Sequence, residues 1–412
     1  MLNKEILNPE IQEYINSHLQ VDVQQLAMAK SPFTGVTAQE LANQITSKNK
    51  AEKKLPTWYK ANYIYYPAAL SIEQTSSEKT AAYKADLIGT KTVVDITGGF
   101  GVDSFYFAKN AAKVLHCEIN QELSQIAEHN ASVLGATNMT FLATDGIDYL
   151  QQTAETFNTI YVDPARRGGL GKVFMLKDCT PNVVEHMDLL LKKGEQVIIK
   201  TSPLLDISAG LKELKHVTRV HIVSTKNECK ELLFILAKTP ADEVKIVSVT
   251  INDTIKKFEM AMDQRAEITI ADQLQAYIYE PDVALLKSGG FNVIAEAYGL
   301  EKLHEQTQIY TSDVFKQEFP GRIFEVEETI SSATLKKKKD IKANIIVRSY
   351  PEKPAALAKK YNIKPAKDDF LIFTKTKISN NLIIKAKLIQ YYLRKTPFRR
   401  SGRALFFKGA KC

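Results

Sequence analysis

From residue 92 onward, short runs rich in β-branched residues alternate with helical segments, and this rhythm limits the possible fold more than any other feature. The runs are TVVDI, KVLHCE, MTFLATD, TIYVD, QVIIKTS, RVHIVS and ELLFILA. Strands joined by helices return to a sheet in the same direction and form a parallel sheet. Only TKNECK separates the last two runs, too little for a helical crossover, so these strands should pair antiparallel. The sequence therefore predicts a seven-stranded α/β sheet over residues 89–240, with six parallel strands and one reversed strand at an edge.

The rest of the chain differs in character on the two sides of this sheet. Residues 1–88 show helical spacing and form a helical domain in this interpretation; Thr37 has the position of an N-cap, and Glu40 follows three residues later. Residues 241–335 mix strand and helix patterns, which predicts an α+β (ferredoxin-like) segment, and residues 336–412 form a separate basic end. With 412 residues, 44% of them hydrophobic, the chain is long enough for several cores.

Charge is unevenly distributed along the chain. Residues 336–412 hold 22 of the 55 Lys and Arg but only 4 of the 47 Asp and Glu, a net charge of +18, whereas residues 1–335 carry −10. A basic end joined to an acidic body indicates a nucleic-acid partner, although a merely solvated basic surface would give the same counts. The tail also interleaves aromatic and basic residues, a mixture that can stack on bases and pair with phosphates. Its candidate phosphate-binding residues are Arg394, Arg399, Arg400 and Arg403.

Several classes of protein and site are not indicated. The chain has no secretory signal pattern and no apolar run of about 18 residues, so we expect no membrane segment and a cytoplasmic location. Four cysteines without a CxxC pair and seven histidines without an HxxxH or HxH set predict neither disulfides nor a metal site. Cys117 lies in an apolar run, which predicts a buried thiol. The oligomeric state has no signal in the sequence.

A glycine-rich stretch, VVDITGGFGVD, follows the first predicted strand. Such a turn brings backbone N–H groups close to a ligand without a Cβ in the way. The dinucleotide fingerprint requires a third glycine where Ser104 stands. A phosphate loop requires Gly-Lys-Ser/Thr, but Val102 and Asp103 follow Gly101. The residues at these positions therefore exclude both a dinucleotide-binding turn and a phosphate loop.

Acidic residues at three predicted strand ends indicate another ligand. Asp95 ends the first strand, Glu118 the second and Asp145 the third. A carboxylate beside the glycines suits a cation better than a pyrophosphate. An acid at the second strand can accept from ribose hydroxyls, as in NAD sites too, and one at the third can accept from an adenine amino group. Together these acids favour the sulfonium nucleotide S-adenosylmethionine.

The stretch resembles the first motif of the class I S-adenosylmethionine-dependent methyltransferases, which have a Rossmann-like sheet of seven strands. That motif runs acid, x, Gly, x, Gly, x, Gly; here it is DITGGFG, with Thr97 in place of the first glycine. The resemblance covers roughly residues 75–240. It implies a cofactor site formed by Asp95, Thr97, Gly98, Gly99, Gly101, Asp103, Glu118 and Asp145.

Longer stretches resemble a bacterial family of such methyltransferases with a C-terminal THUMP-like domain. They are EQTSSEKTAAYKADL, DITGGFGVD, VDPARRGG, YEPDVALLKSG and the basic end. THUMP domains proper bind RNA, so the resemblance implies an RNA substrate, tRNA or rRNA, in agreement with the distribution of charge.

The predicted fourth strand ends in VDPARRGG, where Asp163 and Pro164 match the fourth methyltransferase motif and are the catalytic candidates. N-methylating members continue with Pro and an aromatic residue, but this chain has Ala165 and Arg166, so methylation of a flipped base amine has weak support. Pyrimidine C5-methyltransferases require a cysteine in this motif or after strand five. Neither Ala165 nor KTSPLL supplies one, so a covalent intermediate is not expected.

Arg166 and Arg167 are the unusual residues of this stretch. A pair of guanidinium groups there could hold a substrate phosphate or orient Asp163, and a structural ion pair is an equal alternative. Overall we expect an RNA methyltransferase. A protein or small-molecule methyltransferase, and an RNA-binding protein that retains the nucleotide pocket without turnover, stay open.

Overall fold

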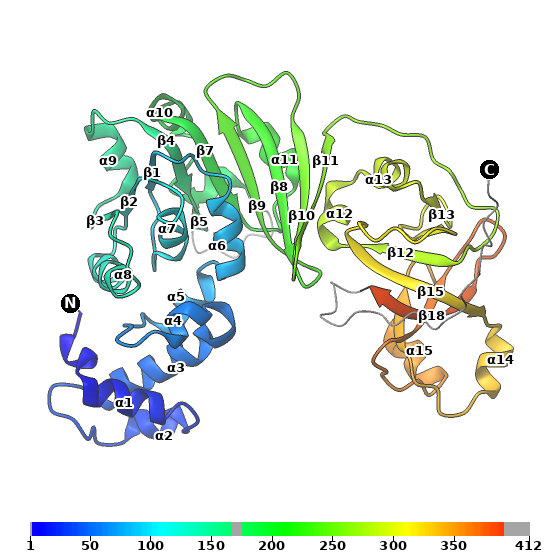
Figure 1. Cartoon of the computed structure of the whole chain (residues 1–412), viewed down its shortest axis with the longest axis horizontal. Helices are drawn as coiled ribbons and strands as arrows, with labels where there is room; N and C mark the ends of the chain where they lie inside the picture. Colours follow the sequence, from blue (N-terminus) through cyan, green and yellow to red (C-terminus); the bar gives the residue numbers. More distant parts are fainter. Residues whose placement is uncertain (1, 167–174, 391–412) are drawn as a thin grey trace, which may run out of the picture. The chain divides into compact units, whose positions relative to one another are not determined.

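The computed structural model describes residues 2–166 and 175–390 and divides into two compact units. Unit 1 consists of Met1–Ile251 and Lys257–Gln264, and unit 2 of Asn252–Lys256 and Arg265–Cys412. Each unit is built around a large sheet of its own (Figure 1).

Helices fill the chain up to residue 85, as predicted. Thr37 caps the longest of them: its hydroxyl accepts from Glu40 N at 3.2 Å, and the Glu40 carboxylate accepts from Thr37 N at 2.7 Å, which confirms the capping box. The segments are η1 (Lys4–Leu7), α1 (Pro9–Ser17), α2 (Val23–Met28), α3 (Ala38–Lys54), α4 (Pro56–Lys60), α5 (Ala69–Gln74) and α6 (Glu78–Ala85).

These helices share a core with the sheet that follows. Ile45 and Trp58 belong to the same buried cluster as Val93 and Phe107, and the Trp58 ring meets the Phe105 ring edge-on, with centroids 4.9 Å apart. Figure 1 shows α6 (light blue) leading from the lower helices up to the sheet. The helical segment and the sheet therefore form one unit.

The sheet of unit 1 has the strand order β11-β10-β8-β9-β7-β4-β1-β2-β3 (Figure 1). Strands β7, β4, β1, β2 and β3 are parallel to their neighbours in that run, as predicted. The strands are β1 (Thr92–Asp95), β2 (Lys113–Cys117), β3 (Met139–Leu142), β4 (Phe157–Val162), β7 (Gly194–Thr201), β8 (Val217–Thr225), β9 (Glu228–Ala237), β10 (Lys245–Ile251) and β11 (Ile255–Ala261). All seven predicted strands are present.

The reversed strand does not lie at an edge, which corrects the prediction. β9 pairs antiparallel with both β7 and β8 and so lies inside the sheet. Its residues 231–236 are all buried, as expected for a strand covered on both faces. The sheet also extends past residue 240, because β10 pairs parallel with β8 and β11 lies beside β10. It therefore has nine strands rather than seven.

Short helices connect the parallel strands, and a small strand pair follows β4. The helices are α7 (Val102–Phe107), α8 (Gln121–Val133), α9 (Gly146–Gln152), η2 (Leu176–Asp178), α10 (Met187–Lys193) and α11 (Ile207–Glu213). The small pair joins β5 (Ala165–Arg166) antiparallel to β6 (Cys179–Thr180).

Unit 2 contains a mixed sheet with the order β13-β14-β12-β15-β18-β17-β16, which confirms the expected α+β character. β16 and β17 are parallel and joined by α15, whereas the pairs β12–β14, β12–β15, β15–β18 and β17–β18 are antiparallel. Its elements are β12 (Tyr277–Pro281), α12 (Val283–Ser288), α13 (Phe291–Tyr298), β13 (Glu301–Lys302), β14 (Tyr310–Ser312), β15 (Gly321–Thr329), α14 (Ser332–Lys337), β16 (Asn344–Val347), α15 (Pro354–Lys360), β17 (Asp369–Thr374) and β18 (Leu382–Gln390).

Candidate active site

The glycine turn connects β1 to α7 and lies against β2. A Cβ added at Gly98 would stand 2.2 Å from the His116 ring, so only glycine fits there. Gly99 and Gly101 have φ values of +55° and +80°, in the left-handed region that glycine adopts without strain. Above Gly99 there is space, since an added Cβ would meet nothing closer than the Thr97 carbonyl at 3.9 Å. The turn is therefore packed on its inner side and open at Gly99.

Asp95 ends β1 beneath this turn and is 1% exposed. Its carboxylate accepts from Thr97 N at 3.1 Å and from the Ser104 hydroxyl at 2.6 Å. Burial, together with the charges of Asp103 and Asp163, outweighs these hydrogen bonds and raises the pKa of Asp95 to about 7. The site thus contains a carboxylate whose charge is costly until a cation lies near it.

The other two predicted acids lie on the same side of the sheet. Glu118 follows β2, and its carboxylate accepts from Gly99 N and from Asn120 N, both at 2.8 Å. Asp145 follows β3 as the N-cap of α9 and accepts from Ile147 N at 2.7 Å. Because β1, β2 and β3 are adjacent and parallel, their carboxyl ends meet at one edge. The structure therefore brings the three acids to the border of the glycine turn.

Thr97, the residue that departs from the family motif, connects the turn to the fourth motif. Its hydroxyl accepts from Asp163 N at 2.7 Å and lies 3.5 Å from an Asp95 carboxylate oxygen. A glycine at this position would lack both contacts. Thr97 therefore fixes the start of the DPAR stretch against the glycine turn.

Asp163 has a cationic partner that the sequence interpretation missed. Lys200, near the end of β7, forms an ion pair with the Asp163 carboxylate, whose side chain is 37% exposed. Burial alone would lower the pKa of Lys200, but the carboxylates of Asp163, Asp103 and Glu231 hold it above its usual value. The strand ends of β4 and β7 thus carry a charged pair beside the turn.

A buried ionic network lies next to the strand ends that carry Asp95, Asp163 and Lys200. Lys84 of α6 is fully buried and lies 3.0 Å from carboxylate oxygens of both Asp103 and Glu231. Asp103 also accepts from the hydroxyls of Ser76 and Tyr161, each at 2.8 Å. Burial by itself would raise the pKa of Asp103. The positive charges of Lys84 and Lys200 outweigh burial, so the pKa of Asp103 lies below its usual value. These contacts give Asp103 a supporting position and no contact that would mark it as a cofactor ligand.

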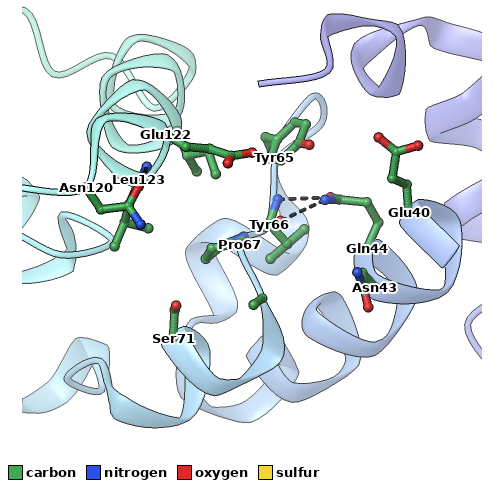
Figure 2. Close-up of a pocket in the computed structure, with 12 residues that line it drawn as sticks. Glu40, Asn43, Gln44, Tyr65, Tyr66, Pro67, Ser71, Asn120, Glu122 and Leu123 are labelled. Carbon is green, nitrogen blue, oxygen red and sulfur yellow. Dashed lines mark hydrogen bonds between the residues drawn. The ribbon is translucent and has the colours of Figure 1, made fainter. Parts of the chain in front are cut away.

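An open cleft of about 330 Å³ adjoins the start of α8 (Figure 2). Gln44 closes one side of it through two hydrogen bonds with the Tyr66 backbone, at 2.7 and 2.9 Å. The lining residues are Glu40, Asn43, Gln44, Tyr65, Tyr66, Pro67, Ala68, Ser71, Asn120, Glu122, Leu123 and Ile126. Among them are two carboxylates and no Lys or Arg, so the cleft favours hydrogen-bond donors over phosphates.

Comparison with known proteins adds the family context. A ferredoxin-like domain family matches residues 277–320, and a THUMP domain-like family matches residues 321–387. A solved candidate methyltransferase from Porphyromonas gingivalis W83 is 29% identical, with a TM-score of 0.84, and the match covers 95% of this chain and 100% of that one. Residues 321–387 thus form a THUMP-like domain, and nearly the whole chain is similar to that solved protein.

The curated relatives match only a short stretch of this chain. An uncharacterised RNA methyltransferase of Mycoplasma mobile is 36% identical over 78 residues, 19% of this chain and 22% of that protein. The 23S rRNA (uracil(1939)-C(5))-methyltransferase RlmD of Marinomonas posidonica is 37% identical over 79 residues, 19% and 18% of the two chains. The match thus spans about a fifth of the length of these relatives.

Several predicted residues lie at the border of the described parts of the chain or outside them. Pro164 is buried directly after Asp163, and the backbone of Arg166 lies in β5. Arg167, Arg394, Arg399, Arg400 and Arg403 lie outside the described residues. Cys117 is fully buried as predicted, and burial raises its pKa to about 12.

Ile119 is a further candidate ligand contact that the sequence interpretation did not include, although its position could have indicated it. Ile119 follows Glu118 and is 73% exposed, although isoleucine is usually buried. Its place directly after a predicted strand-end acid could have marked it as a contact for a flat apolar ligand. In the described parts of the chain, no helix is long and apolar enough to cross a membrane, and no His, Cys, Asp and Glu group suits a metal ion.

Proposed function

We propose that this chain is an S-adenosylmethionine-dependent methyltransferase that modifies RNA without a covalent cysteine intermediate. The observation that carries the proposal is the meeting of the glycine turn, three strand-end acids and the Thr97 to Asp163 contact at one edge of the sheet. This edge holds groups for a cationic nucleotide and, beside it, a polar group for an acceptor.

The residues present fit the cofactor. The open side of Gly99 admits the ligand close to the backbone, and Asp95 supplies the buried negative charge. In this proposal Glu118 would accept from the ribose hydroxyls, Ile119 would pack against the adenine ring, and Asp145 would accept from the adenine amino group. When bound, S-adenosylmethionine supplies a methyl group on a positively charged sulfur.

Asp163 and Pro164 are the proposed contacts for the methyl acceptor. The Asp163 carboxylate is partly exposed and lies beside the turn, where it can accept a hydrogen bond from an acceptor N–H or O–H. Lys200 balances its charge and holds its orientation. Cys179 lies on the strand paired with Arg166, but it is 1% exposed, so its thiol does not face an open site.

RNA as the substrate has two independent supports. The short matches are to proteins named as RNA methyltransferases, one of them acting on 23S rRNA. The THUMP domain-like match overlaps the basic part of the chain, and the overlapping residues 336–387 carry a net charge of +11. We therefore propose rRNA or tRNA as the substrate, which implies action in the cytoplasm.

Calorimetry with S-adenosylmethionine, followed by transfer of a labelled methyl group to total RNA and to total protein, tests the proposal. We expect binding and label in RNA, with Asp163→Ala binding the cofactor normally and losing transfer. Label in protein alone would favour a protein methyltransferase, and cofactor binding without any transfer would favour a non-catalytic RNA-binding protein. Full turnover of Asp163→Ala would remove Asp163 from the mechanism.

A further inference from the structure

The YEPD stretch of the sequence forms an ionic cluster in unit 2 that the cofactor site does not use. Glu280 is 2% exposed at the end of β12, and its carboxylate binds two guanidinium groups. Arg322 contacts one carboxylate oxygen through Nε and Nη2, and Arg348 contacts the other through Nη2 at 2.7 Å. Two positive charges thus share one negative charge.

The backbone fixes this cluster closely. Glu280 faces Arg322 in the β12 and β15 register, and Pro281 faces Gly321. A Cβ at Gly321 would lie 2.2 Å from the Glu280 carbonyl oxygen, so glycine is required for this approach. The Arg322 guanidinium also lies over the Phe324 and Phe370 rings, 5.7 and 5.6 Å from their centroids. The Arg322 guanidinium is therefore fixed both by its ion pair with Glu280 and by its contacts with the two aromatic rings.

Arg348 occupies the more open position. It follows β16, its backbone N donates to Phe373 O at 2.9 Å, and its Nη1 donates to Val347 O at 3.0 Å. Its side chain is 39% exposed, against 21% for Arg322. It stands at the carboxyl end of the parallel β16 and β17 strands, the end at which parallel strands usually present ligand contacts.

Further polar groups lie beside Arg348 at this end of the strands. The Ser349 hydroxyl donates to Gln306 O at 3.2 Å, and Lys375 Nζ donates to the Gln306 side chain at 2.6 Å. Lys375 directly follows β17. Gln306 thus links the Lys375 ammonium to Ser349, the residue that follows Arg348.

We propose that Arg322 and Arg348, oriented by Glu280, form a binding site for a phosphate group of the RNA backbone. Each guanidinium has N–H groups beyond those used in the contacts above, and the planar fork of Arg suits phosphate oxygens. The site rests on the proposed RNA substrate and gives it a place of contact. Glu280 comes from the segment matched as ferredoxin-like and both arginines from the THUMP-like segment, so both segments are needed to build it.

The test measures equilibrium binding of a fluorescently labelled single-stranded RNA to the full chain over a series of salt concentrations. Removing one phosphate contact should lower the slope of log affinity against log salt by about 0.7 and weaken binding about fivefold at physiological salt. We expect this for Arg348→Gln and a smaller effect for Arg348→Lys, which keeps the charge. Arg219→Gln, an exposed arginine of unit 1, makes the same charge change as a control and should leave the slope unchanged.

A second variant separates a binding site from a structural ion pair. Glu280→Gln removes the competing negative charge but keeps an oxygen that can accept from an arginine. Folded protein should therefore bind RNA at least as tightly as the wild type, although its unfolding temperature should fall because both arginines lose their charged partner. If the cluster were only structural, Arg348→Gln would lower the unfolding temperature with no change in the salt slope, and the proposal would be wrong.

Two further outcomes are distinguishable. If the wild type itself binds no RNA, the proposed RNA substrate fails together with this site. If the wild type binds RNA and the Arg348→Gln slope is unchanged, only this site fails. The last measurement is thermal unfolding with inorganic phosphate at matched ionic strength. Phosphate that stabilises the wild type but not Arg348→Gln, while the salt dependence of RNA binding is the same in both, would assign the site to free phosphate and overturn the RNA assignment.

Discussion

We expect S-adenosylmethionine to bind more weakly below pH 7, because Asp95 takes up a proton there. Its pKa is raised to about 7 by burial and by the neighbouring charges of Asp103 and Asp163. With that pKa, the ionised fraction falls from about nine-tenths at pH 8 to about one-tenth at pH 6. A cation that requires the carboxylate should then lose about tenfold in affinity, about 1.4 kcal/mol.

Calorimetry at pH 6, 7 and 8 measures this directly, with Asp95→Asn as the matched control. The wild type should show the tenfold decrease, whereas the variant should bind weakly at every pH and show a flat profile. A flat profile in the wild type, or the same slope in the variant, would refute the reasoning that connects Asp95 to the cation.

Stability gives an independent measurement of the same group. Between the ordinary Asp value of 3.8 and about 7, the folded state keeps a proton that the unfolded chain releases. The contribution of Asp95 to the free energy of unfolding therefore falls as the pH rises through this window, by at most about 4 kcal/mol. Denaturation at pH 5 and pH 8 should show Asp95→Asn losing less stability than the wild type; equal losses would mean that the carboxyl group titrates normally.

Substitutions at three further positions test the geometry of the site. Gly98→Ala places a methyl group against the His116 ring and should cost about 1 to 3 kcal/mol of stability together with most cofactor affinity, measured by thermal unfolding and calorimetry; normal binding would contradict the packing described. Thr97→Val leaves Asp163 N without its acceptor and should lower kcat by about 10- to 100-fold with little change in cofactor affinity, and an unchanged kcat would count against the link. Lys200→Met should lower methyl transfer and shift its pH profile, and Lys200→Arg should recover part of the rate; equal rates in both variants would exclude a role for the positive charge.

The features best predicted from the sequence are those that depend on a local pattern of residues. The acids Asp95, Glu118 and Asp145 were found because each stands at the end of a recognisable strand, and parallel strands end at a common edge. The capping box of Thr37 and Glu40 is predictable because the motif spans only four consecutive residues.

The sequence did not predict the features that depend on contacts between distant segments. Lys84 and Glu231 are 147 residues apart, and no periodicity connects them. The position of β9 inside the sheet also depends on long-range pairing, although the unbroken apolar run LLFIL is typical of a strand covered on both faces and could have excluded an edge. Thr97 departs from the motif in the sequence, and only the fold brings Asp163 N to its hydroxyl.

The position of Lys84 has a consequence for how this protein can be divided. The ammonium group that neutralises Asp103 and Glu231 comes from α6, before the first strand of the sheet. A fragment that begins at residue 89 would retain both buried carboxylates without their counter-ion and would uncover the apolar surface on which Trp58 packs. The smallest piece of the chain that can hold the cofactor site together therefore includes the N-terminal helices as well as the sheet.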